Sequence, residues 1–149
     1  MSKKTIRSIL VIDDDPDDFD LVSAIVQGID PDIEVSFAGT CEDAMQYKGR
    51  AFDLILLDIN MPAHDGFYWL RSIREHGHTD LPIVMYTNSR SPVQIKKAYE
   101  EGANLFFPKP ESFDHMISSF KKLVQLDWSD PFSITRSYHR GEKYETFAA

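Results

Sequence analysis

Four short, largely apolar runs constrain the fold of this chain more than any other feature of its sequence. They are Ser8–Ile12, Leu54–Leu57, Ile83–Tyr86 and Leu105–Phe107. A continuous apolar run of this length is typical of a strand buried on both faces, as in a parallel sheet. Residues Ile33–Phe37 alternate between apolar and polar instead, which predicts a more exposed strand at an edge of the sheet.

Segments with the spacing of amphipathic helices lie between and after these runs. The predicted helices are residues 15–28, 40–49, 66–76, 91–102 and 113–124. Their apolar residues recur every three or four positions, so we place Leu21 and Phe113 on the buried stripes of the first and last helices. Gly28 is the predicted end of the first helix, because glycine commonly follows the last helical turn. The alternation of strands and helices with short connections predicts an open α/β sheet with right-handed crossovers.

Composition limits the class of protein. The chain has 149 residues, the size of one domain, and a formal net charge of −8. So acidic a protein gains no affinity from counterion release at phosphates, and we expect no direct nucleic-acid binding. Cys41 is the only cysteine, which excludes an internal disulfide and fits a reducing compartment. Because no apolar run is long enough for a signal peptide or a membrane span, we expect a cytoplasmic protein without membrane contact.

The regular pattern ends near Asp127. We therefore divide the chain into a domain of residues 5–126 and an extension of residues 127–149, with no separate output domain. The extension has no sustained period, but it contains five aromatic residues: Trp128, Phe132, Tyr138, Tyr144 and Phe147. The sequence leaves open whether they belong to a flexible tail, pack back on the domain, complete a dimer or bind a partner.

Residues that can carry chemistry stand directly after the buried runs. Asp13 and Asp14 follow the first run, Asp58 the second, Thr87 the third, and Lys109 lies just beyond the fourth. The carboxyl ends of parallel strands meet at one edge of an open α/β sheet, so we expect these side chains to converge there. Several carboxylates and one amine leave an excess of negative charge. A hard divalent cation would compensate it, and Mg²⁺ suits a site that supplies two or three protein oxygens.

Several enzyme classes are disfavoured by the sequence. It contains no GxxxxGK[ST] loop, which argues against a nucleoside triphosphate as ligand. No second carboxylate stands two residues after Asp58, which argues against an aspartate-nucleophile phosphatase of the dehalogenase type. None of the five histidines follows a strand, so we interpret them as surface residues. Asp58 can still accept a phosphoryl group as an acyl phosphate, with Mg²⁺, Lys109 and the Thr87 hydroxyl stabilising its three oxygens.

These fragments resemble the receiver domain of two-component response regulators. The resemblance rests on Ile9–Pro16, Leu57–Pro62 with Gly66, Thr87 and Lys109–Pro110, which match in type, order and spacing. It covers roughly residues 5–126. It implies a flavodoxin-like (βα)5 fold with strand order 2-1-3-4-5 and helices on both faces of the sheet.

The resemblance also implies a role for each residue of the site. Asp58 would be the phosphoacceptor, and Lys109 would pair with it or with its phosphoryl group. Asp14 would bind Mg²⁺ directly, Asp13 mainly through water, and Asn60 through its backbone carbonyl. The other aspartates near the first strand are interpreted as stabilising a helix N-terminus: Asp15, Asp17, Asp18 and Asp20.

A switch and a readout surface follow from the same resemblance. On phosphorylation Thr87 would move toward the phosphoryl group and Phe106 would swing inward, a shift between two packings. The sequence leaves open whether Phe106 is such a switch or only a core residue. Phe107 would point to the opposite face of the sheet as a core residue. The Lys109–Pro110 bond would be cis. Helix four, strand five and helix five would form the surface that a downstream protein reads.

The resemblance predicts a stand-alone response regulator. It would receive a phosphoryl group from a histidine kinase or a phosphotransfer protein, and signal by altered protein–protein binding or by onward relay. It would not be an enzyme in the usual sense, catalysing only its own Mg²⁺-dependent phosphorylation and slow dephosphorylation. The alternative is a receiver-like scaffold or interaction module that no longer responds to phosphorylation. Monomer and homodimer both remain open.

Overall fold

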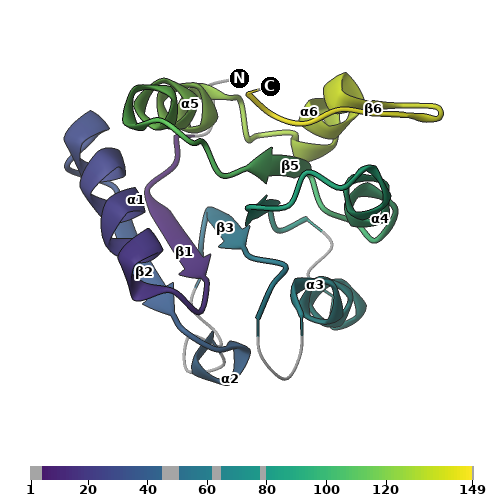
Figure 1. The fold of residues 1–149 in the computed structure, drawn as a ribbon, viewed down its shortest axis with the longest axis horizontal. Coiled ribbons are helices and arrows are strands. Elements are labelled where there is room, and N and C mark those ends of the chain that lie inside the picture. Colours follow the sequence, from purple (N-terminus) through teal and green to yellow (C-terminus); the bar gives the residue numbers. More distant parts are fainter. Residues whose placement is uncertain (1–4, 45–50, 62–64, 78–79, 149) are drawn as a thin grey trace.

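Five parallel strands form the central sheet of the protein, in the order β2-β1-β3-β4-β5 (Figure 1). The computed structural model describes residues 5–44, 51–61, 65–77 and 80–148; residues 45–49 of the predicted second helix lie outside these ranges, as do Pro62, His64 and His78. The strands are β1 (Ser8–Ile12), β2 (Glu34–Ala38), β3 (Leu54–Leu57), β4 (Ile83–Thr87) and β5 (Leu105–Pro108). The predicted strand order is confirmed.

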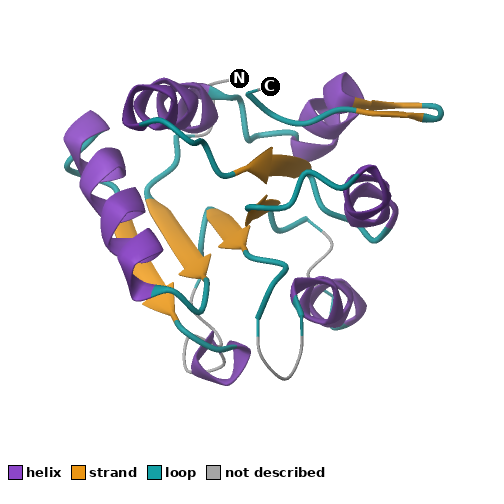
Figure 2. Ribbon diagram, viewed as in Figure 1, coloured by secondary structure: helices purple, strands orange, loops and turns teal. Residues whose placement is uncertain are grey.

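Helices cover both faces of this sheet (Figures 1 and 2). On one face lie α1 (Pro16–Ile29) and α5 (Phe113–Gln125), and on the other α3 (Gly66–Glu75) and α4 (Pro92–Glu100). The short α2 (Cys41–Ala44) packs against β2. A polar side chain accepts a hydrogen bond from a backbone N–H in the first turn of each longer helix, which explains where these helices begin. The caps are Asp15, Asp65, Ser91 and Ser112.

Each face of the sheet has its own apolar core. Phe107 packs with Tyr86 and Phe120 on the face covered by α1 and α5. Phe106 belongs to the core on the other face, together with Tyr99 of α4. The prediction that Phe106 and Phe107 point to opposite faces is confirmed, because successive side chains of a strand alternate. Strand β2 is partly exposed, as predicted for an edge, whereas the residues of β1, β3 and β4 are nearly all buried.

Three local predictions were wrong. Helix α1 continues through Gly28 to Ile29, since one glycine costs a helix only about 1 kcal/mol and the N–H of Asp30 still donates to a carbonyl of the last turn. Leu21 is 39% exposed because the buried stripe of α1 runs one position further along, through residues 22, 25 and 26. Phe113 is 58% exposed because it is the first residue of α5, where the buried stripe has not yet begun.

The aromatic extension packs back on the domain. It contains α6 (Pro131–Tyr138) and a hairpin of β6 (His139–Arg140) and β7 (Lys143–Tyr144), which lie beside α4 and β5 (Figure 1). Trp128 and Phe147 are each 1% exposed and belong to the core under α1 and α5. Of the possibilities that the sequence left open, packing onto the domain is therefore the one observed.

Within the described part of the chain, no helix combines the length and the apolar character needed to cross a membrane.

Candidate functional site

The ends of two neighbouring strands bring three carboxylates together. Asp13 and Asp14 follow β1, and Asp58 follows β3, which pairs with β1 in parallel register. One carboxylate oxygen from each lies within 4.8 Å of the others. Asp13 is 1% exposed and Asp58 6% exposed, while Asp14 is open to solvent. The predicted acidic cluster is thus assembled at the carboxyl edge of the sheet.

Strands β4 and β5 add a hydroxyl group and an amine to this edge. Thr87 is completely buried, and its hydroxyl lies close enough to the Asp58 carboxylate to lower the pKa of that group. The backbone N–H of Lys109 donates to the Thr87 carbonyl at 2.7 Å, which holds the end of β5 against the end of β4. The Lys109 Nζ lies 3.9 Å from the Asp58 Oδ2 and donates to the Asp13 Oδ2 at 2.8 Å. All five residues predicted from the strand ends therefore share one site.

Asp18 is a member of this site that sequence reasoning missed. It stands in the first turn of α1, and its Oδ2 accepts a hydrogen bond from the Lys109 Nζ at 2.5 Å. The sequence interpretation gave Asp18 only a role at the helix N-terminus. Its position five residues after Asp13 was the available signal, because one further helical turn carries a side chain back over the end of β1.

Burial dominates the electrostatics of the cluster. It raises the pKa of Asp13 to about 6, although the hydrogen bond from Lys109 acts in the opposite direction. Burial likewise raises the pKa of Asp58, against the attraction of the Lys109 ammonium. For Lys109, burial alone would lower the pKa, but its hydrogen bonds to Asp13 and Asp18 outweigh that effect and the pKa is raised. The lysine therefore stays cationic, yet one ammonium does not offset the carboxylates around it.

The backbone that carries Asp58 is held by a glycine. A Cβ atom on Gly66 would lie 2.2 Å from the Asp58 carbonyl oxygen and 2.9 Å from the Ile59 Cα. The N–H of Gly66 donates to the Ile59 carbonyl at 2.9 Å, which fastens the start of α3 to the loop after β3. Only glycine allows so close an approach of the two backbones.

The donor set of the site fits a hard cation. Asp13, Asp14 and Asp58 offer clustered carboxylate oxygens, and Mg²⁺ is commonly bound by one or two carboxylates together with waters. Soft ligands are absent from this cluster, which disfavours the metals that select sulfur. The acidic pocket is therefore compatible with Mg²⁺.

Three further predicted features lie near the cluster. The N–H of Asn60 donates to the Asp58 Oδ1 at 3.4 Å, which places Asn60 directly beside the carboxylate. Phe106 is completely buried and belongs to the core on the face of the sheet that α3 and α4 cover. The Lys109–Pro110 bond is trans, and the prediction of a cis bond was wrong. That prediction rested on the family alone, and trans is the ordinary form of such bonds.

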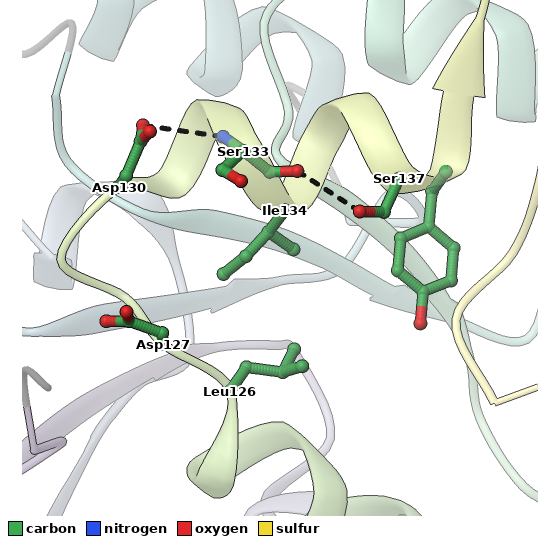
Figure 3. A pocket seen from close by; sticks show the side chains of 7 residues that line it. Leu126, Asp127, Asp130, Ser133, Ile134 and Ser137 are labelled. Carbon is green, nitrogen blue, oxygen red and sulfur yellow. Dashed lines mark hydrogen bonds between the residues drawn. The ribbon is translucent and has the colours of Figure 1, made fainter.

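A hollow lies away from this edge, between the end of α5 and α6 (Figure 3). It has a volume of about 460 Å³ and is lined by Leu126, Asp127, Asp130, Ser133, Ile134, Ser137 and Tyr138. The polar groups on its α6 side are engaged locally, since Asp130 accepts from the Ser133 N–H and the Ser137 hydroxyl donates to the Ser133 carbonyl. None of the predicted site residues contributes to this hollow.

The fold and the acidic site together define a class of protein. A parallel sheet of order 2-1-3-4-5 whose strand ends carry acidic residues, a threonine and a lysine is the arrangement of a receiver domain of two-component signalling. The sequence matches the response regulator receiver domain family over residues 9–121. The chain belongs to this family. Receiver domains act in phosphorelay signalling with histidine kinases or phosphotransfer proteins and with downstream targets, and they are signalling domains rather than classical enzymes.

Known proteins agree with this assignment. The DNA-binding dual master transcriptional regulator RpaA of Synechocystis is 31% identical over 119 residues, which cover 78% of this chain and 48% of RpaA. The chain spans 33% and 31% of the length of two other relatives, YxdJ of Bacillus subtilis and BceR of Halalkalibacterium halodurans. It therefore spans half or less of these curated relatives.

Solved structures share the fold. The phosphorylated cyanobacterial phytochrome response regulator RcpA superposes with a TM-score of 0.74 at 22% identity, covering 83% of this chain and 95% of RcpA. The chemotaxis response regulator CheY4 of Vibrio cholerae gives a TM-score of 0.67 at 27% identity, covering 80% of this chain and 99% of CheY4.

Proposed function

We propose that this chain is a stand-alone response regulator that accepts a phosphoryl group on Asp58 from a histidine kinase or a phosphotransfer protein. The position of Asp58 carries the proposal. Its carboxylate is 6% exposed, lies in the cluster with Asp13 and Asp14, and has the Lys109 ammonium 3.9 Å away. A carboxylate so placed has groups on several sides that can receive the charge of a phosphoryl group.

The transfer is a nucleophilic displacement at phosphorus. An Asp58 carboxylate oxygen attacks the phosphorus atom opposite the bond to the donor. An O–P bond forms and the P–N bond to the donor imidazole breaks. The nitrogen keeps the bonding electron pair, and the ring, protonated at its other nitrogen, leaves in its neutral form.

The other residues of the site stabilise the transferred group. In this structure the Lys109 ammonium donates hydrogen bonds to Asp13 and Asp18. In the phosphorylated protein it would turn to a phosphoryl oxygen, and the Thr87 hydroxyl would donate to another. Asp13, Asp14, Asp58 and the Asn60 backbone carbonyl would hold Mg²⁺. When bound, Mg²⁺ supplies positive charge beside the phosphoryl oxygens.

The signal would leave the domain through α4, β5 and α5. Thr87 and Phe106 stand on adjacent strands, where Phe106 is paired in register with Met85 and Thr87 with Pro108. A movement of Thr87 toward the phosphoryl group would therefore shift the part of β4 with which β5 is paired. The result would be altered binding of a downstream protein, or relay of the phosphoryl group to a further protein.

The test is phosphorylation by acetyl phosphate, with and without Mg²⁺, followed on a phosphate-affinity gel. Wild type should give a retarded band that requires Mg²⁺ and is absent from Asp58→Asn. Asp17→Asn, an exposed aspartate of α1, is the matched control for the change of charge and should give the band. If wild type gives no band and binds no beryllofluoride, the proposal is wrong and the receiver-like scaffold replaces it.

A further inference from the structure

The C-terminal segment 139–147, called here the strap, closes the free edge of β5. The N–H of Phe147 donates to the carbonyl of Phe106 at 2.8 Å. β5 is an edge strand of the sheet, and its outward backbone groups would otherwise face solvent. Leu105, Phe106 and Phe107 are nevertheless at most 1% exposed. The strap thus gives an edge strand the burial of a central one.

One tyrosine ties the strap to Phe106 a second time. The Tyr99 hydroxyl, on α4, accepts from the Phe106 N–H at 3.2 Å and donates to the Glu145 carbonyl at 2.6 Å. Both backbone polar groups of Phe106 are therefore engaged by the strap or by its tyrosine bridge. The strap is therefore anchored on the backbone of the residue whose side chain is expected to switch, which places the two in direct contact.

A row of contacts also leads from the phosphorylation site to the strap. The Lys109 Nζ lies 5.5 Å from the centroid of the Tyr86 ring. The centroid of that ring is 5.0 Å from that of Phe107, and the Phe107 centroid is 5.2 Å from that of Phe147. Packed side chains in direct contact can transmit a rearrangement when they have two alternative packings.

The strap occupies part of the surface that was proposed to read out the signal. Strand β7 lies against α4, where the ring of Tyr144 stacks on that of His139 and lies 6.1 Å from that of Tyr99. Helix α6 packs against β5 (Figure 1). A partner that binds the edge of β5 must displace the strap, which is held at high effective concentration because it belongs to the same chain.

We propose that the strap is an intramolecular ligand of the α4–β5 face that holds Phe106 in its buried position and thereby favours phosphorylation of Asp58. The inference rests on the proposed function, in which the phosphorylated state is the one with Phe106 inward. The docked strap and the buried Phe106 occur together in this structure. Two ligands that favour one state strengthen each other's binding by the same factor. Loss of the strap must then weaken binding of a phosphoryl group, and a bound phosphoryl group must tighten the strap.

The experiment measures both halves of this coupling in the full chain. Beryllofluoride with Mg²⁺ is the probe, and its affinity is measured by calorimetry for wild type and Phe147→Ala. Phe147→Ala should bind at least about fivefold more weakly, the lower end of ordinary coupling between sites. Phe132→Ala is the matched control, because Phe132 lies in the same extension but is 50% exposed; its affinity should stay within about twofold of wild type. Deletion of the whole extension is unsuitable, since it would also remove the buried Trp128.

Hydrogen exchange in wild type supplies the reciprocal measurement and needs no variant that might fail to fold. The amides of Glu145 and Phe147, which bond to Tyr138 and Phe106, should exchange more slowly once beryllofluoride is bound. If wild type binds beryllofluoride and Phe147→Ala binds it equally well or more tightly, the inference is wrong, whereas the proposed function still stands. Unchanged or faster exchange of these two amides does the same. Absence of beryllofluoride binding in wild type overturns the proposed function, and the inference with it.

Discussion

Replacement of Gly66 by alanine should displace Asp58. The added Cβ would meet the Asp58 carbonyl oxygen at 2.2 Å, which is 0.8 Å short of the 3.0 Å that real Cβ contacts respect, and it would meet the Asp58 carbonyl carbon and the Ile59 Cα at 2.9 Å. All three atoms belong to the backbone, so no side-chain rotation can relieve the overlap. The loop after β3 or the start of α3 has to move by several tenths of an ångström.

The structure sets the size of the effect. Overpacking of this kind costs about 1–3 kcal/mol, and a rigid backbone contact belongs at the upper end. The gain in helix propensity from alanine offsets at most about 1 kcal/mol, so the net loss of unfolding free energy should be about 2 kcal/mol. For a domain of this size that corresponds to a melting temperature lower by roughly 4–8 °C. A shift of nearly 1 Å in a reacting group can cost about a hundredfold in rate, so phosphorylation of Gly66→Ala should slow at least tenfold.

Gly28→Ala is the matched control for Gly66→Ala. Gly28 lies within α1, and a Cβ at this position meets nothing within 4 Å. The same substitution should therefore stabilise the protein by about 0.5–1 kcal/mol and leave the phosphorylation rate unchanged. Thermal unfolding and the time course of phosphorylation by acetyl phosphate measure both quantities. If Gly66→Ala is as stable as wild type and is phosphorylated as fast, the close approach does not position Asp58 and the reasoning is refuted.

Three further predictions concern the metal, a half-buried arginine and the extension. Saturating Mg²⁺, at about 100 times its Kd, should stabilise wild type by about 2.7 kcal/mol in thermal unfolding, and Asp14→Asn should lose at least half of that gain; equal gains would exclude Asp14 as a ligand. Arg74→Ala should cost about 3 kcal/mol in urea unfolding, because the Arg74 guanidinium donates to the carbonyl groups of residues 81 and 102, which alanine leaves unpaired. Arg136 is exposed and serves as the control: the unfolding free energy of Arg136→Ala should stay within about 0.5 kcal/mol of wild type. If Arg136→Ala loses as much stability as Arg74→Ala, the loss comes from removing a charge and not from the unpaired carbonyl groups. Trp128→Ala should cost about 3–5 kcal/mol by the same assay, since its side chain is 1% exposed, and a loss below 1 kcal/mol would contradict its place in the core.

The sheet and most of the site could be predicted because both depend on position along strands. The apolar runs coincide with β1, β3, β4 and β5, since a strand buried on both faces has no polar positions within it. Asp13, Asp58, Thr87 and Lys109 were placed together from one geometric fact, namely that the carboxyl ends of parallel strands meet. No knowledge of side-chain conformation was needed for that step.

Other contacts could not be predicted because they depend on how individual side chains turn. The bond from Lys109 to Asp18 joins residues 91 positions apart and requires a particular turn of α1 over the sheet. Phe147 docks on β5 through backbone groups and a single aromatic side chain, and such contacts produce no periodic pattern in the sequence. The exposure of Leu21 shows the same limit, since one position along a helix separates a buried side chain from a solvated one.

The bond between Lys109 and Asp13 spans 96 residues and joins β5 to β1, with β3 and β4 between them in the sheet. The ammonium therefore reaches the carboxylates only after four strands have taken their places. During synthesis, Asp58 leaves the ribosome well before Lys109, and in that interval the Lys109 ammonium cannot lie beside its carboxylate. A chain that is still incomplete, or one cut before β5, would be a poor phosphoryl acceptor. On the proposed function, phosphorylation of Asp58 would therefore depend on a completed sheet, because Lys109 reaches the site only when β5 is in place.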